Sequence, residues 1–482
     1  MKVVRCCAHS FAPAWVLLAI VNVCLPTRVR AAEDERPPNF VFILCDNLGY
    51  GDWGCFGSTV HRTPHIDRLA ADGVRLTHFY STSGVCTPSR ASLMTGCYPR
   101  RVGMHQNDRG GLVLQPVEPV GLNPHEVTIA EVLQSRGYAT ALVGKWHLGD
   151  QPKFLPTRHG FDEYFGIPYS DDMTPREGKP WPPLPLVQNE RVIEAPVDRT
   201  TLTRRYTERT IEFIQRHKDR PFFICLAHAM PGSTRAPFAS ERFQGKSANG
   251  PWGDSVEEID WSTGEIVRAV RELDLDRQTI VVMTSDNGAP KREPPQGSNA
   301  PLGGWGYTTA EGGMRVPCIV RWTDHVPAGT ECAELSTMMD WLPTFAHLAA
   351  AELPSDRIID GRDILPLLKE PTTAKTPHEA FYYYQGERLE AVRAGEWKLY
   401  VPKKGLRRRH TALAEVLPRL YNVIADPAET QDEIASHPEI VERLKALAGR
   451  AREDLGDGNR PGKGQRPPAR IAQPQPLMLD AQ

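Results

Sequence analysis

Four short apolar runs, each of which ends abruptly at polar residues, constrain the fold of this 482-residue chain more than any other feature. The runs cover residues 40–45, 140–144, 222–227 and 279–285. They have the length of a strand and no helical period, which is typical of strands that are covered on both faces. Helical patterns lie between them, at residues 128–134, 202–216 and 255–273. This alternation predicts an α/β fold in which a largely parallel sheet is flanked by helices.

The polar residues at the ends of the four runs are candidates for one shared site, because ligands of such sheets bind beyond the carboxyl ends of the strands. They are Asp46 and Asn47, then Lys145, Trp146 and His147, then His228, and finally Asp286 and Asn287. The aspartates and asparagines are hard oxygen donors, which suit calcium or magnesium better than a softer metal, although Asx turns would use the same residues. A divalent cation held there would attract an anionic ester and stabilise negative charge on the transferred group.

The C-terminal part of the chain, from about residue 371, follows a different pattern. Shorter apolar runs lie at residues 380–385, 390–392, 397–401 and 419–422, and a helical pattern covers residues 438–455. They predict a small antiparallel sheet with a helix packed on it. We therefore expect a large domain at residues 36–370 and a smaller subdomain at residues 371–456. Residues 457–482 are rich in Gly, Pro and Gln and lack the apolar content to fold, so they are expected to form a disordered tail.

Residues 1–32 have the features of a signal peptide. Lys2 and Arg5 precede an apolar run at residues 16–25, and small residues suited to cleavage follow at residues 29–32. The apolar run is about half the roughly 20 residues that a membrane-spanning helix needs, so we expect no stable membrane span in the mature chain. The sequence therefore predicts a secreted or periplasmic protein. Its formal net charge of -2 gives no reason to expect nucleic acid as a partner.

Three of the ten cysteines lie in this leader, which leaves seven, an odd number for an oxidising compartment. The seven are Cys45, Cys55, Cys86, Cys97, Cys225, Cys318 and Cys332. Either one thiol stays free or one cysteine is chemically special. Cys45, Cys225 and Cys318 lie inside apolar runs, where a buried free thiol is expected, and spacing alone does not pair the others.

The segment Cys86-Thr87-Pro88-Ser89-Arg90, followed by Leu93-Met94-Thr95-Gly96, is the most specific motif of the chain. Pro88 favours a helix start, and Arg90 can turn its guanidinium group back toward Cys86. Tyrosine-phosphatase loops place more residues between their Cys and Arg, so a thiolate phosphatase fits poorly. The segment resembles the signature of the sulfatases, and this resemblance implies an alkaline-phosphatase-like sandwich fold.

In the sulfatase family a maturation enzyme oxidises the signature Cys to formylglycine (3-oxoalanine), and the resemblance implies the same change at Cys86. One hydroxyl of the hydrated aldehyde attacks sulfur, and deprotonation of the other then expels sulfate and restores the aldehyde. A thiol or a serine could perform only the first half of this reaction. The modification would also explain why one of the seven mature cysteines need not pair.

The resemblance extends from about residue 39 to residue 432 and is closest to the arylsulfatase A group. It is carried by residues 46–52, 144–149, 166–170, 253–255, 285–288 and 311–313. By this similarity calcium, or magnesium as the alternative, would be ligated by Asp46, Asn47, the modified Cys86, Asp286 and Asn287. Arg90 would hold the nucleophile in place, and His147 would act as the base on its second hydroxyl. Lys145 and Ser170 would bind the sulfate or the formylglycine.

Three positions depart from the pattern of this group. Asn47 stands where a second Asp is usual, which removes one negative charge but leaves an oxygen ligand. Gly232 stands where relatives have the His that donates to the leaving oxygen. The usual Lys is missing from residues 303–311, around Trp305. The last two departures affect the side of the site from which the alcohol leaves.

Several replacements for these leaving-group residues are open. His228 could swing in and bind the substrate, Arg235 or Lys246 could supply the positive charge, or the site could be tuned to another substrate or be inactive. Loss of a general acid slows a reaction by roughly 10²- to 10⁴-fold, and poor leaving groups suffer more than activated aryl esters. The proline-rich loop at residues 172–199 is expected to lie over the mouth of the pocket.

Hydrolysis of sulfate esters is the leading functional hypothesis, on aryl sulfates or, in nature, on sulfated carbohydrate. The expected partners are a sulfated small molecule or glycan and a maturation enzyme that generates formylglycine. Two alternatives stay open. The chain could hydrolyse phosphate or phosphonate monoesters, as some members of the wider superfamily do. It could also be a catalytically impaired protein that binds sulfated glycans.

Overall fold

The computed structural model describes residues 1–4, 7–8, 36–402, 407–408, 411–412 and 417–479. Its contacts divide the chain into two units, Met1–Arg36 and Pro37–Gln482, and the larger unit carries all the elements described below. The predicted signal peptide falls mostly on residues 5–6 and 9–35, which lie outside the described residues, so secretion stays a prediction. Within the described ranges, no helix is both long enough and apolar enough to cross a membrane.

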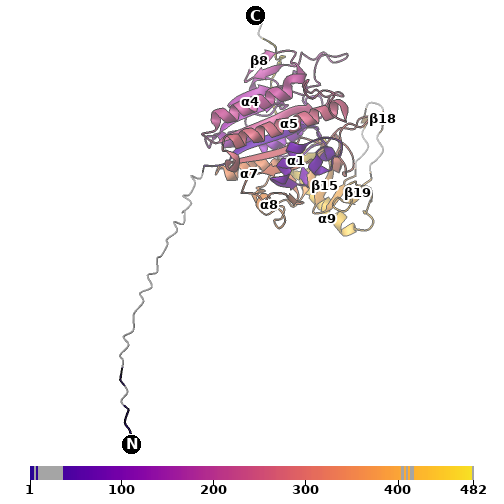
Figure 1. Cartoon of the computed structure of the whole chain (residues 1–482). Helices are drawn as coiled ribbons and strands as arrows, with labels where there is room; N and C mark the ends of the chain where they lie inside the picture. The colour runs from indigo at the N-terminus through magenta and orange to yellow at the C-terminus, as the bar shows by residue number, and fades with distance from the viewer. Residues whose placement is uncertain (5–6, 9–35, 403–406, 409–410, 413–416, 480–482) are drawn as a thin grey trace. The chain divides into compact units, whose positions relative to one another are not determined.

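A ten-stranded sheet forms the centre of the larger unit, in the order β12-β2-β11-β10-β1-β9-β5-β6-β7-β8 (Figure 1). Its middle consists of β10 (Thr279–Ser285), β1 (Asn39–Asp46), β9 (Phe222–Pro231) and β5 (Ala139–Gly144). These are the four strands that the sequence predicts, and they run parallel to one another. The carboxyl ends of all four therefore lie at the same edge of the sheet, together with the polar residues at the ends of β1, β5 and β10, whereas His228 lies inside β9.

Shorter strands complete the two sides of the sheet. β6 (Glu163–Gly166) continues the parallel set, and β7 (Leu186–Gln188) and β8 (Arg191–Glu194) follow it in antiparallel pairing. The opposite side holds β11 (Cys318–Arg321), β2 (Val74–Leu76) and β12 (Thr330–Cys332). Because β7 and β8 fall within residues 172–199, the second half of that predicted loop forms strands that extend the sheet.

Helices cover both faces of the sheet, which explains why the central strands are continuously apolar. Phe42 of β1 belongs to one core and its neighbour Ile43 to a second one, because successive side chains of a strand point to opposite faces. The core around Phe42 includes residues of α2 (Cys86–Thr95), α3 (Ile129–Gln134) and α7 (Trp341–Leu348). The core around Ile43 includes residues of α1 (Pro64–Ala71), α4 (Leu202–His217) and α5 (Gly250–Glu272).

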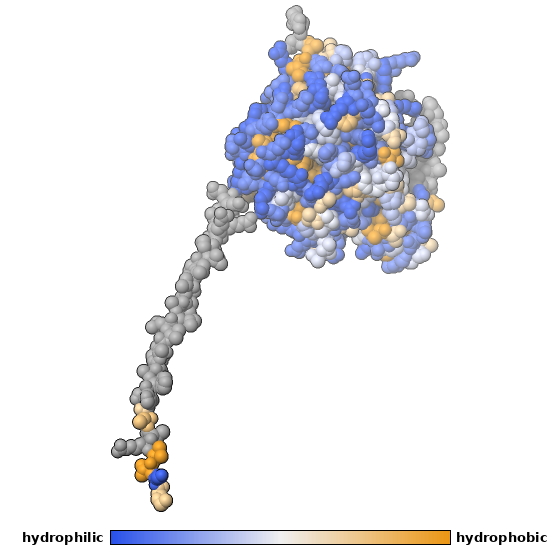
Figure 2. Space-filling view, in the orientation of Figure 1, coloured by the Kyte–Doolittle hydropathy of each residue, from blue (hydrophilic) through white to orange (hydrophobic). Residues whose placement is uncertain are grey.

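Helices α4 and α5 lie side by side on their face of the sheet (Figure 1). Ile259 of α5 is buried against the strands, whereas the outer surfaces of the two helices carry ion pairs such as Arg204–Glu208 and Arg268–Glu272. Figure 2 shows the surface over these helices as mainly hydrophilic. The two helices are thus amphipathic layers that close one side of the main core.

A second sheet, with four antiparallel strands, lies in the C-terminal part of the chain. Its strands are, in order, β14 (Phe381–Gln385), β15 (Arg388–Ala394), β16 (Trp397–Tyr400) and β19 (Arg419–Asn422). Helix α9 (Pro438–Asp454) packs on it through Leu444 and Leu447. The predicted fold class, a largely parallel sheet between helices plus a smaller antiparallel sheet with a helix, is confirmed.

The remaining short elements connect these layers. They are β3 (Phe79–Tyr80), β4 (Val120–Gly121), α6 (Glu311–Met314), β13 (Ser336–Thr337), α8 (Leu365–Lys369), β17 (Arg407–Arg408) and β18 (Thr411–Ala412).

The C-terminal tail differs from the expectation of disorder as far as residue 479. It forms β20 (Gly456–Asp457), β21 (Arg460–Pro461) and β22 (Ala469–Arg470), and β22 pairs with β4. Arg466 also donates to the carboxylate of Glu126, at 2.7 and 2.8 Å. Backbone pairing and ion pairs hold this segment in place. The expectation of disorder rested on its low apolar content, which does not report on these two kinds of contact.

The cysteines of the described chain are all unpaired. Cys45, Cys225 and Cys318 are buried free thiols, as predicted from the apolar runs around them. No disulfide forms among the described residues, and Cys86 is one of the buried thiols.

Candidate active site

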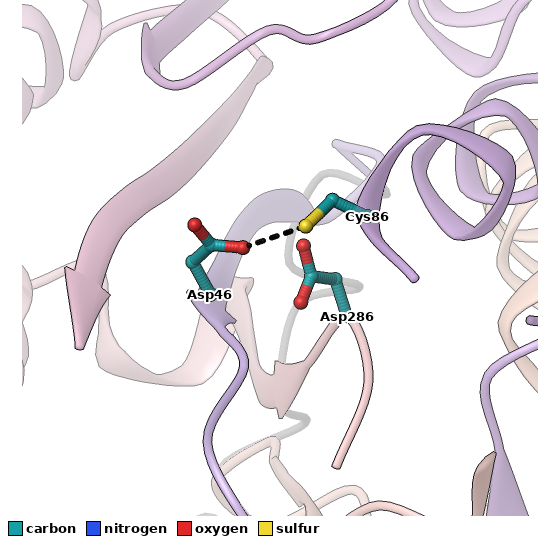
Figure 3. A group of neighbouring side chains, drawn as sticks. All are labelled: Asp46, Cys86 and Asp286. Carbon is teal, nitrogen blue, oxygen red and sulfur yellow. Dashed lines mark hydrogen bonds between the residues drawn. The ribbon is translucent and has the colours of Figure 1, made fainter. Parts of the chain in front are cut away.

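Cys86 is the first residue of α2, and it faces the carboxyl ends of β1 and β10. Its Sγ donates to Oδ1 of Asp46 at 3.2 Å, and one ligand atom from each of Asp46, Cys86 and Asp286 lies within 4.8 Å of the others. Figure 3 shows the three side chains pointing toward one another from the two strand ends and the start of the helix. All three are buried.

Two buried cations balance the two carboxylates of this group. Lys145 donates through Nζ to Asp46 at 2.7 Å and to the hydroxyl of Ser170 at 3.3 Å. Arg90, one helical turn after Cys86, donates through Nε to Asp286 at 3.0 Å and through Nη1 to the carbonyl of Lys145 at 2.6 Å. The structure therefore brings together the predicted nucleophile, its predicted arginine and the predicted sulfate-binding lysine and serine.

The two carboxylates differ in their proton affinity. Burial raises the pKa of Asp46, but the charges of Lys145 and Arg90 outweigh it and hold the pKa below its usual value. Burial, and then the charge of Asp46, raise the pKa of Asp286. A cation between the two carboxylates would oppose this repulsion and lower the pKa of Asp286.

The polar atoms around this pair suit a hard cation. Asn287 donates through Nδ2 to Oδ1 of Asn47 at 2.7 Å, while Oδ1 of Asn287 is buried without a hydrogen-bond partner among the described residues. Two carboxylates, the amide groups of Asn47 and Asn287, and the side chain at residue 86 thus lie together. Such an oxygen-rich set fits calcium or magnesium.

Burial also affects the thiol of Cys86. Burial, and then the negative charge of Asp46, raise the pKa of this thiol well above its usual value. An unmodified Cys86 is therefore a protonated thiol at neutral pH and a poor nucleophile.

His147 presents an unprotonated ring nitrogen in the same region. Its Nε2 lies 3.0 Å from the carbonyl oxygen of Leu114, so Nε2 carries the hydrogen, and its buried Nδ1 has no partner in the described chain. Burial, and then the charge of Lys145, lower the pKa of His147 well below its usual value. The hydroxyl of Thr87, the residue after Cys86, donates to the backbone carbonyl of His147 at 3.0 Å. His147 is thus a neutral base fixed next to the start of α2.

The structure does not bring His228 together with Cys86. Its Nε2 lies 3.4 Å from the hydroxyl of Ser262 on α5, which in turn lies 2.6 Å from the hydroxyl of Thr207 on α4. Burial lowers the pKa of His228 to about 3. His228 therefore belongs to a buried polar group between the sheet and its helices. Lys246 is exposed, and its backbone N–H donates to the carboxylate of Asp254.

The local backbone conformation requires a glycine at residue 232 and excludes a histidine there. Gly232 has a φ of +71°, and a Cβ atom there would lie 2.6 Å from both the carbonyl oxygen of Ala229 and Oδ1 of Asp171. A side chain at this position would therefore be strained and would clash. The carboxylate of Asp171 is buried beside Gly232, with no hydrogen-bond partner among the described residues.

Three residues that sequence reasoning missed lie beside the metal-type ligands. The hydroxyl of Ser233 lies 3.1 Å from Nδ2 of Asn47 and 3.2 Å from the phenol oxygen of Tyr307, and Arg292 donates to the Ser233 carbonyl at 2.7 Å. Desolvation, and then the charge of Cys86, raise the pKa of Tyr307, although 38% of this residue is exposed. Ser233 follows β9, whereas Arg292 and Tyr307 lie in the long connection between β10 and α6, so no local motif marks the three and only the fold brings them together.

The comparisons with known proteins agree with this geometry. The family model described as sulfatase matches residues 38–351, and the model of the C-terminal region of aryl-sulfatase matches residues 376–475. The chain is 35% identical to steryl-sulfatase of Mus musculus (90% of this chain, 86% of the relative) and 39% identical to N-acetylgalactosamine-6-sulfatase of Mus musculus (77% and 73%). It is 37% identical to arylsulfatase A of Homo sapiens (86% and 87%).

One of the similar solved structures contains a carbohydrate. The crystal structure of Ps i-CgsB in complex with k-i-k-neocarrahexaose matches this chain with a TM-score of 0.72 and 27% identity. The match covers 86% of this chain and 92% of that one.

Proposed function

Because the chain belongs to the sulfatase family and is a sulfuric ester hydrolase, we propose that it hydrolyses sulfated carbohydrate with a formylglycine made from Cys86 and a bound calcium ion. The observation that carries this proposal is the position of Cys86. It starts a buried helix, faces Asp46 and Asp286, and lies within a network that includes Arg90 and Lys145.

Formylglycine would supply a hydrated aldehyde, one hydroxyl of which attacks the sulfur of the ester. Its formation from Cys86 is a two-electron oxidation in which an aldehyde replaces the thiol, and it needs a separate maturation enzyme and an oxidant. Calcium, held by Asp46, Asn47, Asp286 and Asn287 together with residue 86, would polarise the sulfate oxygens. The raised pKa of the Cys86 thiol supports a need for such conversion.

The residues of this chain have separate tasks in the proposed reaction. Lys145 lies between Asp46 and Ser170, so its ammonium group can donate to a sulfate oxygen. Arg90 fixes the orientation of Asp286 and stabilises negative charge at residue 86. The bare Nδ1 of His147 can take the proton of the second hydroxyl when sulfate is expelled.

The leaving-group side of the site differs from the arylsulfatase A pattern. In place of the usual histidine and lysine, this chain has the hydroxyl groups of Tyr307 and Ser233 and the guanidinium group of Arg292. These donors can bind the bridging oxygen of an ester or the hydroxyls next to it. A sulfated sugar offers such hydroxyls, and the similarity to an N-acetylgalactosamine-6-sulfatase and to a carbohydrate complex supports this class of substrate.

The predicted signal peptide places this chemistry outside the cytoplasm. Residues 1–32 would direct export, after which the mature chain would act on a sulfated glycan or small molecule in the periplasm or the medium.

The experiment uses protein produced together with a formylglycine-generating enzyme. Mass analysis of the peptide that contains residue 86 should find the aldehyde, and the protein should hydrolyse 4-nitrophenyl sulfate faster than 4-nitrophenyl phosphate in the presence of calcium. Cys86→Ala should abolish turnover, and Cys86→Ser should be limited to a single turnover because serine has only one hydroxyl. Multiple turnovers by Cys86→Ala, or a large preference for phosphate, would contradict the proposal.

A further inference from the structure

A cleft with excess positive charge opens beside the leaving-group side of the candidate active site. It has a volume of about 330 Å³ and is lined by Arg235, Lys291, Arg292, Glu293, Pro294 and Gln296. Three cations and one carboxylate give this lining a net charge of about +2. A cleft of this size accepts a small polar ligand or part of a larger one.

Arg292 connects the cleft to the active site. Its guanidinium group lines the cleft and also donates to the backbone carbonyl of Ser233 at 2.7 Å. The Ser233 hydroxyl lies 3.1 Å from the amide of Asn47, a proposed calcium ligand. Only Ser233 therefore separates the lining of the cleft from the metal-type ligands.

Two residues that line the cleft each have a polar side-chain atom without a partner in the described chain. Nε of Arg292 and Oε1 of Gln296 are both buried without a hydrogen bond. The other end of the Gln296 amide is fixed, because Nε2 donates to the carbonyl of Arg235 at 2.7 Å. Buried polar atoms are nearly always paired in a working state of a protein, so these two lining residues keep an unused donor and an unused acceptor for an anionic ligand that also carries a hydroxyl.

We propose that this cleft binds a second anionic group, a sulfate or a carboxylate, of a saccharide whose sulfate ester lies at Cys86. The inference rests on the proposed function, since it extends the substrate from a single sulfate ester to a polyanionic sugar. Arg292 and Lys291 bind the second anion, Arg235 closes the outer end of the cleft, and Gln296 accepts from a neighbouring hydroxyl. Glu293 opposes the binding of any anion in the same place.

The test compares substrates that differ by one anion. The first substrate is 4-nitrophenyl sulfate, and the second is a disaccharide with one sulfate ester and no other charge. The third substrate is the same disaccharide with a second sulfate, and the fourth is the same disaccharide with a carboxylate. The wild-type protein should have a higher kcat/KM for the third or fourth substrate than for the second, and the advantage should shrink as the salt concentration rises. Whichever of the two is preferred identifies the second anion.

Charge-removing variants give the decisive comparison. Lys291→Gln and Arg235→Gln together should lower kcat/KM for the preferred doubly charged disaccharide by about 10- to 100-fold, as expected for lost hydrogen bonds to charged groups. The same double variant should hydrolyse 4-nitrophenyl sulfate at a rate within about twofold of the wild-type rate. Glu293→Gln should raise kcat/KM for the doubly charged sugar. The control is Lys463→Gln, which removes one exposed positive charge in the C-terminal tail. It should change neither kcat/KM for the doubly charged disaccharide nor the rate on 4-nitrophenyl sulfate.

Two results would overturn the proposal: an equal loss on all substrates, or no loss on any. If the wild-type protein hydrolyses no sulfate ester, the proposed function fails, but the cleft is still tested by calorimetric binding of the disulfated disaccharide to Cys86→Ala. Weaker binding after Lys291→Gln and Arg235→Gln would then support an anion-binding cleft, and unchanged binding would refute it.

Discussion

The ammonium nitrogen of Lys145 lies 2.7 Å from a carboxylate oxygen of Asp46, and neither side chain is exposed. A second buried pair, Arg90 with Asp286 at 2.9 Å, lies beside the first. Each charge is desolvated, so each depends on its partner far more than a charge on the surface does. The position of Cys86 between the two carboxylates therefore depends on a balanced set of four charges.

Replacing Lys145 with Met should destabilise the protein strongly, because it leaves Asp46 buried without its nearest cation. The expected loss in the free energy of unfolding is about 3–5 kcal/mol. Urea denaturation measures it. Lys445→Met is the matched control, since the ion pair of Lys445 with Glu442 is exposed and should contribute less than about 1 kcal/mol. Similar losses in the two variants would contradict the balance of charges described above.

Calcium should stabilise the protein through Asp286. A ligand present at 100 times its Kd adds about 2.7 kcal/mol to the stability of the folded state, so calcium should raise the Tm and a chelator should reverse the rise. Asp286→Asn should abolish this response. Without calcium the variant should be less stable than the wild-type protein, because it leaves the buried guanidinium group of Arg90 without its nearest carboxylate. Calorimetry with and without the chelator checks both expectations. Asp219→Asn, at an exposed carboxylate, should keep the full response to calcium.

The central strands and the charged part of the site could be predicted because each leaves a local mark in the sequence. Strand β1 is buried on both faces, so its residues form an unbroken apolar run, and the run stops where Asp46 enters the site. The same holds for β10 and Asp286. Parallel pairing then requires the two aspartates to meet at one edge, although nothing in either run states which strands are neighbours.

The remaining parts of the site depend on contacts between distant segments. Ser233 and Tyr307 are 74 residues apart and lie in loops of ordinary composition, so their hydrogen bond has no sequence signal. His228 ends an apolar run as the predicted catalytic residues do, yet its side chain points to the helix layer and contacts Ser262. The parity of a residue along a strand decides which face it joins, and a one-residue error in the expected strand register reverses that assignment.

Replacing Tyr307 with Phe should lower kcat/KM more for esters with poor leaving groups than for esters with good ones. The change removes only the hydroxyl that lies beside Ser233, at a position whose φ of +70° an aromatic residue already occupies. If this hydroxyl donates to the leaving oxygen, kcat/KM should fall by roughly 10- to 100-fold for a sulfated sugar and by much less for 4-nitrophenyl sulfate, whose phenolate needs little help. Steady-state kinetics on both substrates measure the ratio. Equal effects on the two substrates would assign Tyr307 to binding of the sulfate and not to the leaving group.

The buried ring of His159 should lower the stability of the folded protein as the pH becomes acidic. The ring is buried beside Trp146, neither of its nitrogens has a hydrogen-bond partner among the described residues, and burial lowers its pKa to about 4. The unfolded chain takes up this proton near its ordinary pKa of about 6.5, whereas the folded protein does so only near 4, so stability is lost through that window as the pH falls. Relative to His159→Phe, the wild-type protein should lose about 2 kcal/mol between pH 7 and pH 5. Urea denaturation of both proteins at the two pH values measures the difference. His125→Gln, at an exposed histidine, should follow the wild-type curve, and a His159→Phe variant with the same pH dependence as the wild type would show that burial does not lower the pKa of His159.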